Sequence, residues 1–185
     1  MNPHDILNFW FDDENKEFLF QKSEAFDEKL KQRFTEVQEQ AVVGNLDGWL
    51  NNGADATLAL ILLLDQLPRN FYRDQARAFA TDGKAVQMTY AALQRGYDLV
   101  FKYEKAIEKM AFLYMPLMHS ELLDNQRRCV DLMLTHVEDA IFHSFARAHH
   151  DIIVRFGRFP HRNKALGRVS TPEEQVFLTQ PGSGF

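Results

Sequence analysis

Basic side chains are concentrated in one short stretch near the end of the chain, "RFGRFPHRN" at residues 155–163. From residue 155 to residue 168 the sequence contains no acid, and its basic residues and histidine are Arg155, Arg158, His161, Arg162, Lys164 and Arg168. Guanidinium groups match carboxylates and phosphates with two parallel hydrogen bonds. Although the chain has more acids than bases, this stretch is therefore predicted to create a local positive electrostatic potential that could bind a small anion.

The same stretch is predicted to leave a helix and to form an anchored loop. Gly157 allows the chain to turn out of the helix, and Pro160 favours an extended residue before it. Phe156 and Phe159 are apolar side chains that would hold the loop against the body of the protein. The alternative is that the arginines pair with surface acids of residues 12–28 or cap helix ends, and so serve the fold alone.

A second polar group, "DQLPRN" at residues 65–70, directly follows the apolar run "ATLALILLL" at residues 56–64. Asp65, Arg69 and Asn70 could line the wall of a pocket at the end of a rigid buried helix. They could equally satisfy the open carbonyl groups of a helix end, with Asp65 paired to Arg69. The sequence leaves both interpretations open.

The triplet His119-Ser120-Glu121 resembles half of a metal site, or else a helix cap followed by a first-turn acid. A metal ion needs three or four converging ligands, and the sequence contains no second cluster with a recognised spacing. We therefore predict no metal. His119 is instead a candidate for proton transfer or anion contact, because the pKa of imidazole lies near neutrality.

Length, charge and cysteine content restrict the class of protein. The 185 residues predict a single all-α domain, residues 1–185, and the net charge of −5 disfavours general binding to nucleic acid or to a membrane surface. The single cysteine, Cys129, excludes an internal disulfide. The N-terminus lacks the features of a signal peptide, and the longest apolar run is about half the length of a membrane span. We expect a cytoplasmic protein without a membrane partner.

Hydrophobic periodicity and helix-end signals predict helices along the whole chain. They are expected over residues 3–11, 23–43, 47–50, 55–67, 81–95, 103–115, 120–135 and 138–156, and from residue 172 onward. Pro68 and Pro116 are expected to end two of them, and Thr171 to begin the last with a capping box. The helix over 138–156 should bury one stripe, made of Ile141, Phe145, Ala148, Ile152 and Phe156. The prediction is an all-α fold of seven to nine helices, since the β-branched runs are short and never alternate.

Several motifs together resemble one bacterial family of uncharacterised proteins, DUF924. They are "LILLLDQLPRNFYR", "RAFATD", "HSE", "RFGRFPHRNKALGRVSTPEEQVFL" and the ending "PGSGF". The resemblance covers nearly the whole chain and implies a TPR-like helical array, but it implies no activity. Leu67 and Met118 depart from the family pattern, which frequently has phenylalanine and glutamate at these positions.

The leading hypothesis is a pocket that binds a small anionic ligand, such as a phosphorylated metabolite. The residues expected to bind it are Asp65, Arg69, Asn70, Asp151, Arg155, Arg158, Arg162 and Asn163. His119, Glu121 and His161 are the candidates for proton transfer. The sequence contains no recognisable pair of nucleophile and base, so catalysis and any cofactor stay open.

The main rival is a scaffold that binds a protein partner. TPR-like arrays present a concave surface to peptides, and arginines there could clamp an acidic segment or a terminal carboxylate. Binding of RNA by residues 155–168 and their phenylalanines is a third interpretation, which the overall negative charge disfavours.

Overall fold

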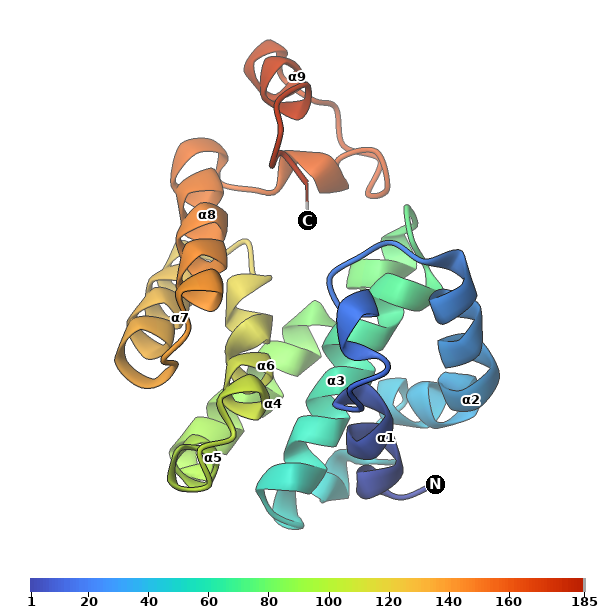
Figure 1. Ribbon diagram of the computed structural model, residues 1–185. Helices are drawn as coiled ribbons and strands as arrows, with labels where there is room; N and C mark the ends of the chain where they lie inside the picture. Colours follow the sequence, from blue (N-terminus) through green and yellow to red (C-terminus); the bar gives the residue numbers. More distant parts are fainter. Residues whose placement is uncertain (185) are drawn as a thin grey trace.

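The computed structural model describes residues 1–184, and the regular structure in this range is entirely helical (Figure 1). It contains nine α-helices joined by short connections that include four 3-10 turns, which confirms the predicted all-α class. The helices are α1 (Pro3–Trp10), α2 (Glu24–Val42), α3 (Ala54–Phe71), α4 (Asp82–Gln94), α5 (Tyr97–Tyr103), α6 (Ile107–Met118), α7 (Leu123–His136), α8 (Ala140–Phe156) and α9 (Pro172–Leu178). The 3-10 turns are η1 (Lys16–Phe18), η2 (Asp47–Asn51), η3 (Ala76–Phe79) and η4 (Pro160–Arg162). No helix in residues 1–184 is long and apolar enough to cross a membrane.

Helix α3 is the centre of the core. Its residues 58–64 are completely buried, as its nearly uniform apolar composition predicts. It contacts α1, α2, α4, α5 and α6, and Figure 1 shows α1 and α2 on one side of it and α4 to α6 on the other. Helix α8 packs on α7 and α6 at the far side of the array. The polar end of α3 is thereby held rigidly inside the protein.

The expectation that Pro68 and Pro116 end their helices is wrong. Helix α3 continues through Pro68 to Phe71, and α6 continues through Pro116 to Met118. Pro68 has no N–H for the carbonyl of Leu64, and the hydroxyl of Thr81 donates a hydrogen bond of 2.5 Å to that carbonyl instead. The tertiary contact replaces the lost helical bond, so the helix persists. Residues 97–103, which the sequence left without a helix of their own, form α5.

The buried face of α8 in the structure is rotated about the helix axis relative to the predicted one. Ile141 is 64% exposed, whereas the buried residues of α8 are Phe142, Ala146, His149, Ile152 and Ile153. The prediction counted apolar positions only, and the buried face includes a histidine. The ends of α8 behave as expected, because Gly157 adopts the left-handed conformation (φ 67°) that terminates the helix.

The C-terminal part forms a small layer against the end of α8. Phe159 is completely buried and packs with Ile152 and Ile153, while Phe156 and Phe177 cover this second apolar cluster. Helix α9 begins with the predicted capping box of Thr171 and Glu174. After α9 the chain returns toward η4, where Gly184 lies beside His161.

Candidate functional site

Asp65 is a fully buried carboxylate in the last turns of α3, and it orients His119 at the end of α6. Both of its oxygens lie 2.9 Å from Nδ1 of His119, and Gln66 Nε2 donates to Oδ2 at 2.6 Å. Arg69 NH1 lies 3.3 Å from Oδ1. A carboxylate only accepts hydrogen bonds, so Nδ1 of His119 carries the hydrogen. In the neutral ring the lone pair therefore sits on Nε2.

The surroundings keep Asp65 charged and His119 neutral near pH 7. Burial by itself would raise the pKa of Asp65, but the positive charge of Arg69 and the hydrogen bond from His119 hold this pKa well below its usual range. Burial is also the largest influence on His119, whose pKa lies below the ordinary value although Asp65 opposes the shift. The side chain of His119 is 14% exposed. It can serve as a hydrogen-bond acceptor or a base at the surface of the cluster.

Two arginines share one carboxylate beside this pair. Arg69 NH2 lies 3.0 Å from Oδ1 of Asp82, and Arg162 NH1 lies 3.0 Å from Oδ2 of the same residue. Arg162 NH2 also donates to the carbonyl of His119 at 2.9 Å. Burial and then the charge of Arg69 together lower the pKa of Arg162 to about 10. We call Asp65, Arg69, Asp82, His119 and Arg162 the Asp65 cluster.

Arg162 is held in place by two aromatic rings. Its guanidinium carbon lies 4.6 Å from the ring centroid of Phe79 and 4.5 Å from that of Phe159. Within residues 1–184, its buried Nε donates no hydrogen bond. The guanidinium group of Arg162 is therefore fixed in orientation, but its Nε–H remains without an acceptor in this part of the chain.

Two further histidines border the cluster. The ring of His149 in α8 lies 5.9 Å from that of His119, and its Nδ1 donates to the carbonyl of Phe145 at 2.8 Å. Burial, followed by the neighbouring His119, lowers the pKa of His149 to about 3. Burial, followed by the charges of Arg162 and Arg69, lowers the pKa of His161 to about 4. Both are therefore neutral at physiological pH.

The other arginines of the basic stretch have carboxylate partners of their own. Arg155 pairs with Glu173 at 2.8 Å, and Arg158 forms a two-pronged pair with Glu174 at 2.6 and 2.8 Å. Arg168 pairs in the same way with Glu121 at 2.7 and 2.9 Å. These acids belong to α9 and to residue 121, not to residues 12–28. The stretch therefore joins α9 and the loop to the body of the protein.

The structure brings together only part of the predicted site. Asp65, Arg69, His119 and Arg162 meet in the Asp65 cluster, with His161 beside them. The remaining predicted residues contact other partners. Asn70 donates to Asp27, Asn163 to Glu174 and Ser170, and Asp151 lies exposed beside His150, while Glu121 accepts from the backbone N–H of Phe159 as well as from Arg168.

Sequence reasoning missed Asp82, Phe79 and His149. Asp82 and Phe79 lie within the motif "RAFATD", to which no chemistry was assigned, and His149 was given no role. In residues 1–184, no group of three His, Cys, Asp or Glu side chains is arranged to hold a metal ion. Cys129 is buried in α7, and burial raises the pKa of its thiol.

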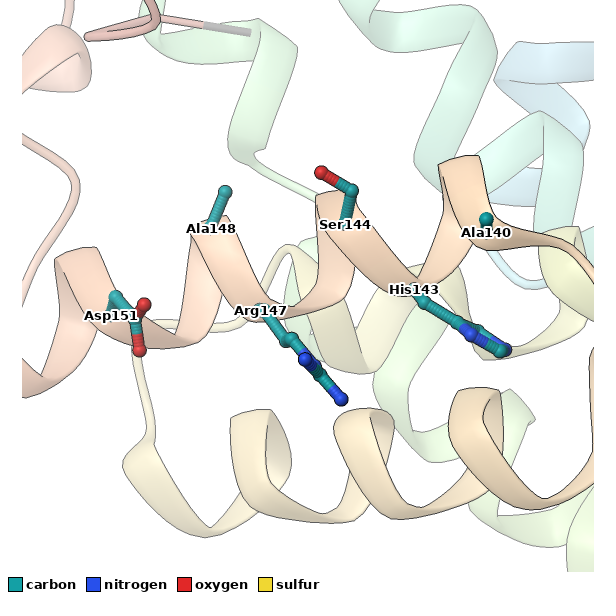
Figure 2. A pocket seen from close by; sticks show the side chains of 6 residues that line it. All are labelled: Ala140, His143, Ser144, Arg147, Ala148 and Asp151. Carbon is teal, nitrogen blue, oxygen red and sulfur yellow. The ribbon is translucent and has the colours of Figure 1, made fainter.

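A shallow hollow of about 530 Å³ lies along the exposed side of α8. Figure 2 shows Ser144 and Ala148 on one side of the helix and His143 and Arg147 on the other, with Asp151 one turn farther along. This surface is distinct from the Asp65 cluster, since His149 on the opposite side of α8 borders the cluster. A second hollow, of about 310 Å³, lies around Phe11 and residues 105–109.

Comparison with known proteins agrees with this architecture. The model of a family described as "Bacterial protein of unknown function (DUF924)" matches residues 6–182. A solved structure, that of the protein of unknown function ATU0120 from Agrobacterium tumefaciens, is similar over 95% of this chain and 96% of its own, with 39% sequence identity and a TM-score of 0.87. None of the curated proteins matches the chain. The fold is thus shared, and neither description names an activity.

Proposed function

Since the chain belongs to the DUF924 family of bacterial proteins, which that description leaves without an activity, we propose from the geometry of this chain that it binds a small anion at the Asp65 cluster. The proposal is supported most strongly by Arg69 and Arg162, which share the single carboxylate of Asp82. The cluster reaches the surface there, because the side chains of Arg69 and Asp82 are 20% and 15% exposed. An anion at this opening would meet guanidinium donors that are already fixed in place.

The crowding of the two cations favours a further negative charge. The pKa of Arg162 is lowered by burial and then by Arg69, so its charged form is destabilised in the absence of a ligand. An anion beside Arg69 and Arg162 would relieve this repulsion. Hydrogen bonds to charged groups contribute about 1.5–3 kcal/mol each. Two of them would be enough for measurable binding of phosphate or sulfate.

Thermal unfolding in sodium phosphate and sodium sulfate tests the proposal. A ligand that binds only the native state stabilises it by about 2.7 kcal/mol at a hundredfold excess over its dissociation constant. In a protein of this size each kcal/mol raises the melting midpoint by roughly 2–4 °C, so we expect a rise of about 5–10 °C. Sodium chloride at matched ionic strength controls for general screening.

Two matched lysine variants locate the binding site. Arg69→Lys keeps the charge but loses the guanidinium fork, and it should strongly reduce the anion-dependent shift. Arg155→Lys makes the same exchange in the exposed pair with Glu173 and should leave the shift unchanged. Equal shifts in the wild type and in both variants would place any anion elsewhere and overturn the proposal.

A protein-binding scaffold is the second candidate, and the hollow along α8 favours it. Small side chains there, such as Ser144 and Ala148, lie next to Arg147 and would allow a peptide to approach the helix closely (Figure 2). A glutamate-rich peptide with a free terminal carboxylate is the probe for this function. Under this alternative, Arg147→Gln abolishes peptide binding and Arg69→Lys does not, whereas the anion-binding proposal expects no specific binding of the peptide.

A further inference from the structure

His119 supplies the Asp65 cluster with a hydrogen-bond acceptor among donors. Its Nδ1 is committed to Asp65, and the hydrogen bonds of the His119 side chain within residues 1–184 are all made by this nitrogen and not by Nε2. The arginines beside it only donate. The titratable and charged groups around His119 are Asp65 and Arg69 of α3, Asp82 of α4, His149 of α8, His161 of η4, and Arg162 of η4, which donates to the His119 carbonyl. A ligand beside His119 and the arginines therefore meets guanidinium donors and, at Nε2, an uncharged acceptor.

Resting on the proposed anion-binding function, we propose that the ligand is an oxyanion that keeps an O–H group near neutral pH, and that it donates this O–H to Nε2 of His119. Inorganic phosphate has this chemistry, because its dianion still carries one O–H, whereas a phosphomonoester loses its last O–H at a second pKa of about 6. Its remaining oxygens accept from the guanidinium groups of Arg69 and Arg162. Asp65 acts as a positioning residue, because it fixes the hydrogen of His119 on Nδ1 and leaves the lone pair of Nε2 to the ligand.

Sulfate differs from hydrogen phosphate in this one respect. The two ions have similar shape and size, but sulfate has no O–H near neutral pH and would place an oxygen lone pair against the lone pair of Nε2. A site built to bind an O–H discriminates strongly against an analogue that lacks it, because a polar group of the site is left without a partner. We expect phosphate to bind about ten- to a hundredfold more tightly than sulfate.

Calorimetric titration of the protein at pH 7.5 separates the possible ligands. Inorganic phosphate keeps an O–H group at this pH, while sulfate, dimethyl phosphate and the dianion of methyl phosphate do not. The proposal expects inorganic phosphate to bind at least tenfold more tightly than each of the other three anions. Equal binding of phosphate and sulfate would overturn this inference but leave the proposed function standing. Absence of binding by all four anions would overturn both.

The variant His119→Phe tests the acceptor directly. Phenylalanine keeps a planar ring but removes Nε2 together with the Nδ1–H that bonds Asp65, so the readout is the ratio of phosphate to sulfate affinity, which should fall to about one. His150→Phe is the matched control, because His150 lies outside the cluster next to Asp151. Retention of the phosphate preference in His119→Phe would overturn the inference.

Nitrogen NMR of the wild-type histidines gives a readout that does not depend on a stable variant. The resonance of the unprotonated Nε2 of His119 should shift when phosphate is added, because this atom accepts a hydrogen bond, and should stay in place when sulfate is added. The Nδ1 resonance should remain that of a protonated nitrogen before and after phosphate is added. This is the result expected if Asp65 positions the ring by holding the hydrogen on Nδ1. A response that is the same for both ions would contradict the proposal.

Discussion

Arginines in two regions of this protein differ in how their charge is matched. In the C-terminal layer Arg155, Arg158 and Arg168 each have a glutamate of their own. In the Asp65 cluster Arg69 and Arg162 share Asp82, and Asp65 is shared between Arg69 and His119. Each arrangement has one carboxylate per arginine, but within residues 1–184 the cluster also has a buried Arg162 Nε that donates no hydrogen bond and a His119 side chain that bonds through Nδ1 alone.

The comparison separates arginines that hold the fold from arginines that suit binding. Glu174 accepts from Arg158 and from the N–H of Thr171, and the pair with Arg158 is the main cause that lowers its pKa to about 2. Asn163 also donates to Glu174, so the carboxylate is fully used. Local density of positive charge in a sequence is therefore a weaker guide to an anion site than the hydrogen-bond donors that the arginines leave unused.

Phe159 connects the two regions, and removing its side chain should have the largest effect. The ring is completely buried, packs on Ile152 and Ile153, and covers one face of Arg162. Phe159→Ala should lower the free energy of unfolding by about 3–5 kcal/mol, measured by urea denaturation. Anion binding should weaken as well, because Arg162 loses one of its supporting rings.

Phe177→Ala is the matched control for this substitution. Phe177 covers the same apolar cluster but is only partly buried, so its loss should be clearly smaller. A loss below about 1 kcal/mol for Phe159→Ala would show that the loop merely lies on the surface, and that the two regions are not coupled.

As the pH is lowered, protonation of the histidines that border the Asp65 cluster should reduce the stability of the protein before protonation of the paired glutamates does. The folded protein holds the pKa of His149 at about 3 and that of His161 at about 4, whereas the unfolded values lie near 6.5. Below pH 6.5 the unfolded chain binds protons that the folded chain does not, so stability falls as the pH falls toward about 4. The slope is about 1.4 kcal/mol per pH unit for each histidine.

Urea denaturation at several pH values measures this dependence. Replacing His161 with Gln should flatten the curve between pH 6.5 and 4, and replacing the exposed His4 should leave it unchanged. The glutamates contribute at lower pH, because stability from Glu174 is lost only as the pH falls from about 4.5 toward 2. A stability curve that is flat down to pH 5 would contradict a neutral, buried state of these histidines.

The local part of the fold could be predicted from the sequence, and the parts set by tertiary contacts could not. The capping box at Thr171 and the turn at Gly157 depend on neighbouring residues only, and both are present as predicted. Pro68 was expected to end a helix because its effect was judged from neighbours alone. The hydroxyl of Thr81, which lies far along the chain, removes that effect.

The site shows the same limit. Asp65, Arg69, His119 and Arg162 were all identified from their types and their positions at helix ends. They were also placed in one predicted pocket, but Asp82 was not, because it carries no local signal that marks it as the partner of two arginines. The glutamates of α9 equally gave no sign in the sequence that they would neutralise the basic stretch.

The capping box of α9 should make a moderate contribution to the C-terminal layer. The hydroxyl of Thr171 accepts from the N–H of Glu174 at 3.2 Å, and Thr171→Ala should lower the free energy of unfolding by about 1 kcal/mol. Thr171→Ser keeps the hydroxyl and should retain most of the stability. Anion binding at the Asp65 cluster should stay unchanged in both variants, and a large loss of binding in Thr171→Ala would show that the two regions are not separate.

The exposed pair of Arg155 and Glu173 should have the smallest effect. Their side chains are 47% and 62% exposed, and solvent-exposed ion pairs contribute about 0.2–1 kcal/mol, less at high salt. A double-mutant cycle of Arg155→Gln and Glu173→Gln should give a coupling free energy below about 0.5 kcal/mol in low salt and close to zero in 1 M sodium chloride. The same cycle for Arg162 and Asp82 should give a larger coupling that persists in salt, because both side chains are largely buried and weakly screened. Equal couplings in the two cycles would mean that burial does not distinguish the two kinds of arginine, and the contrast between the regions would fail.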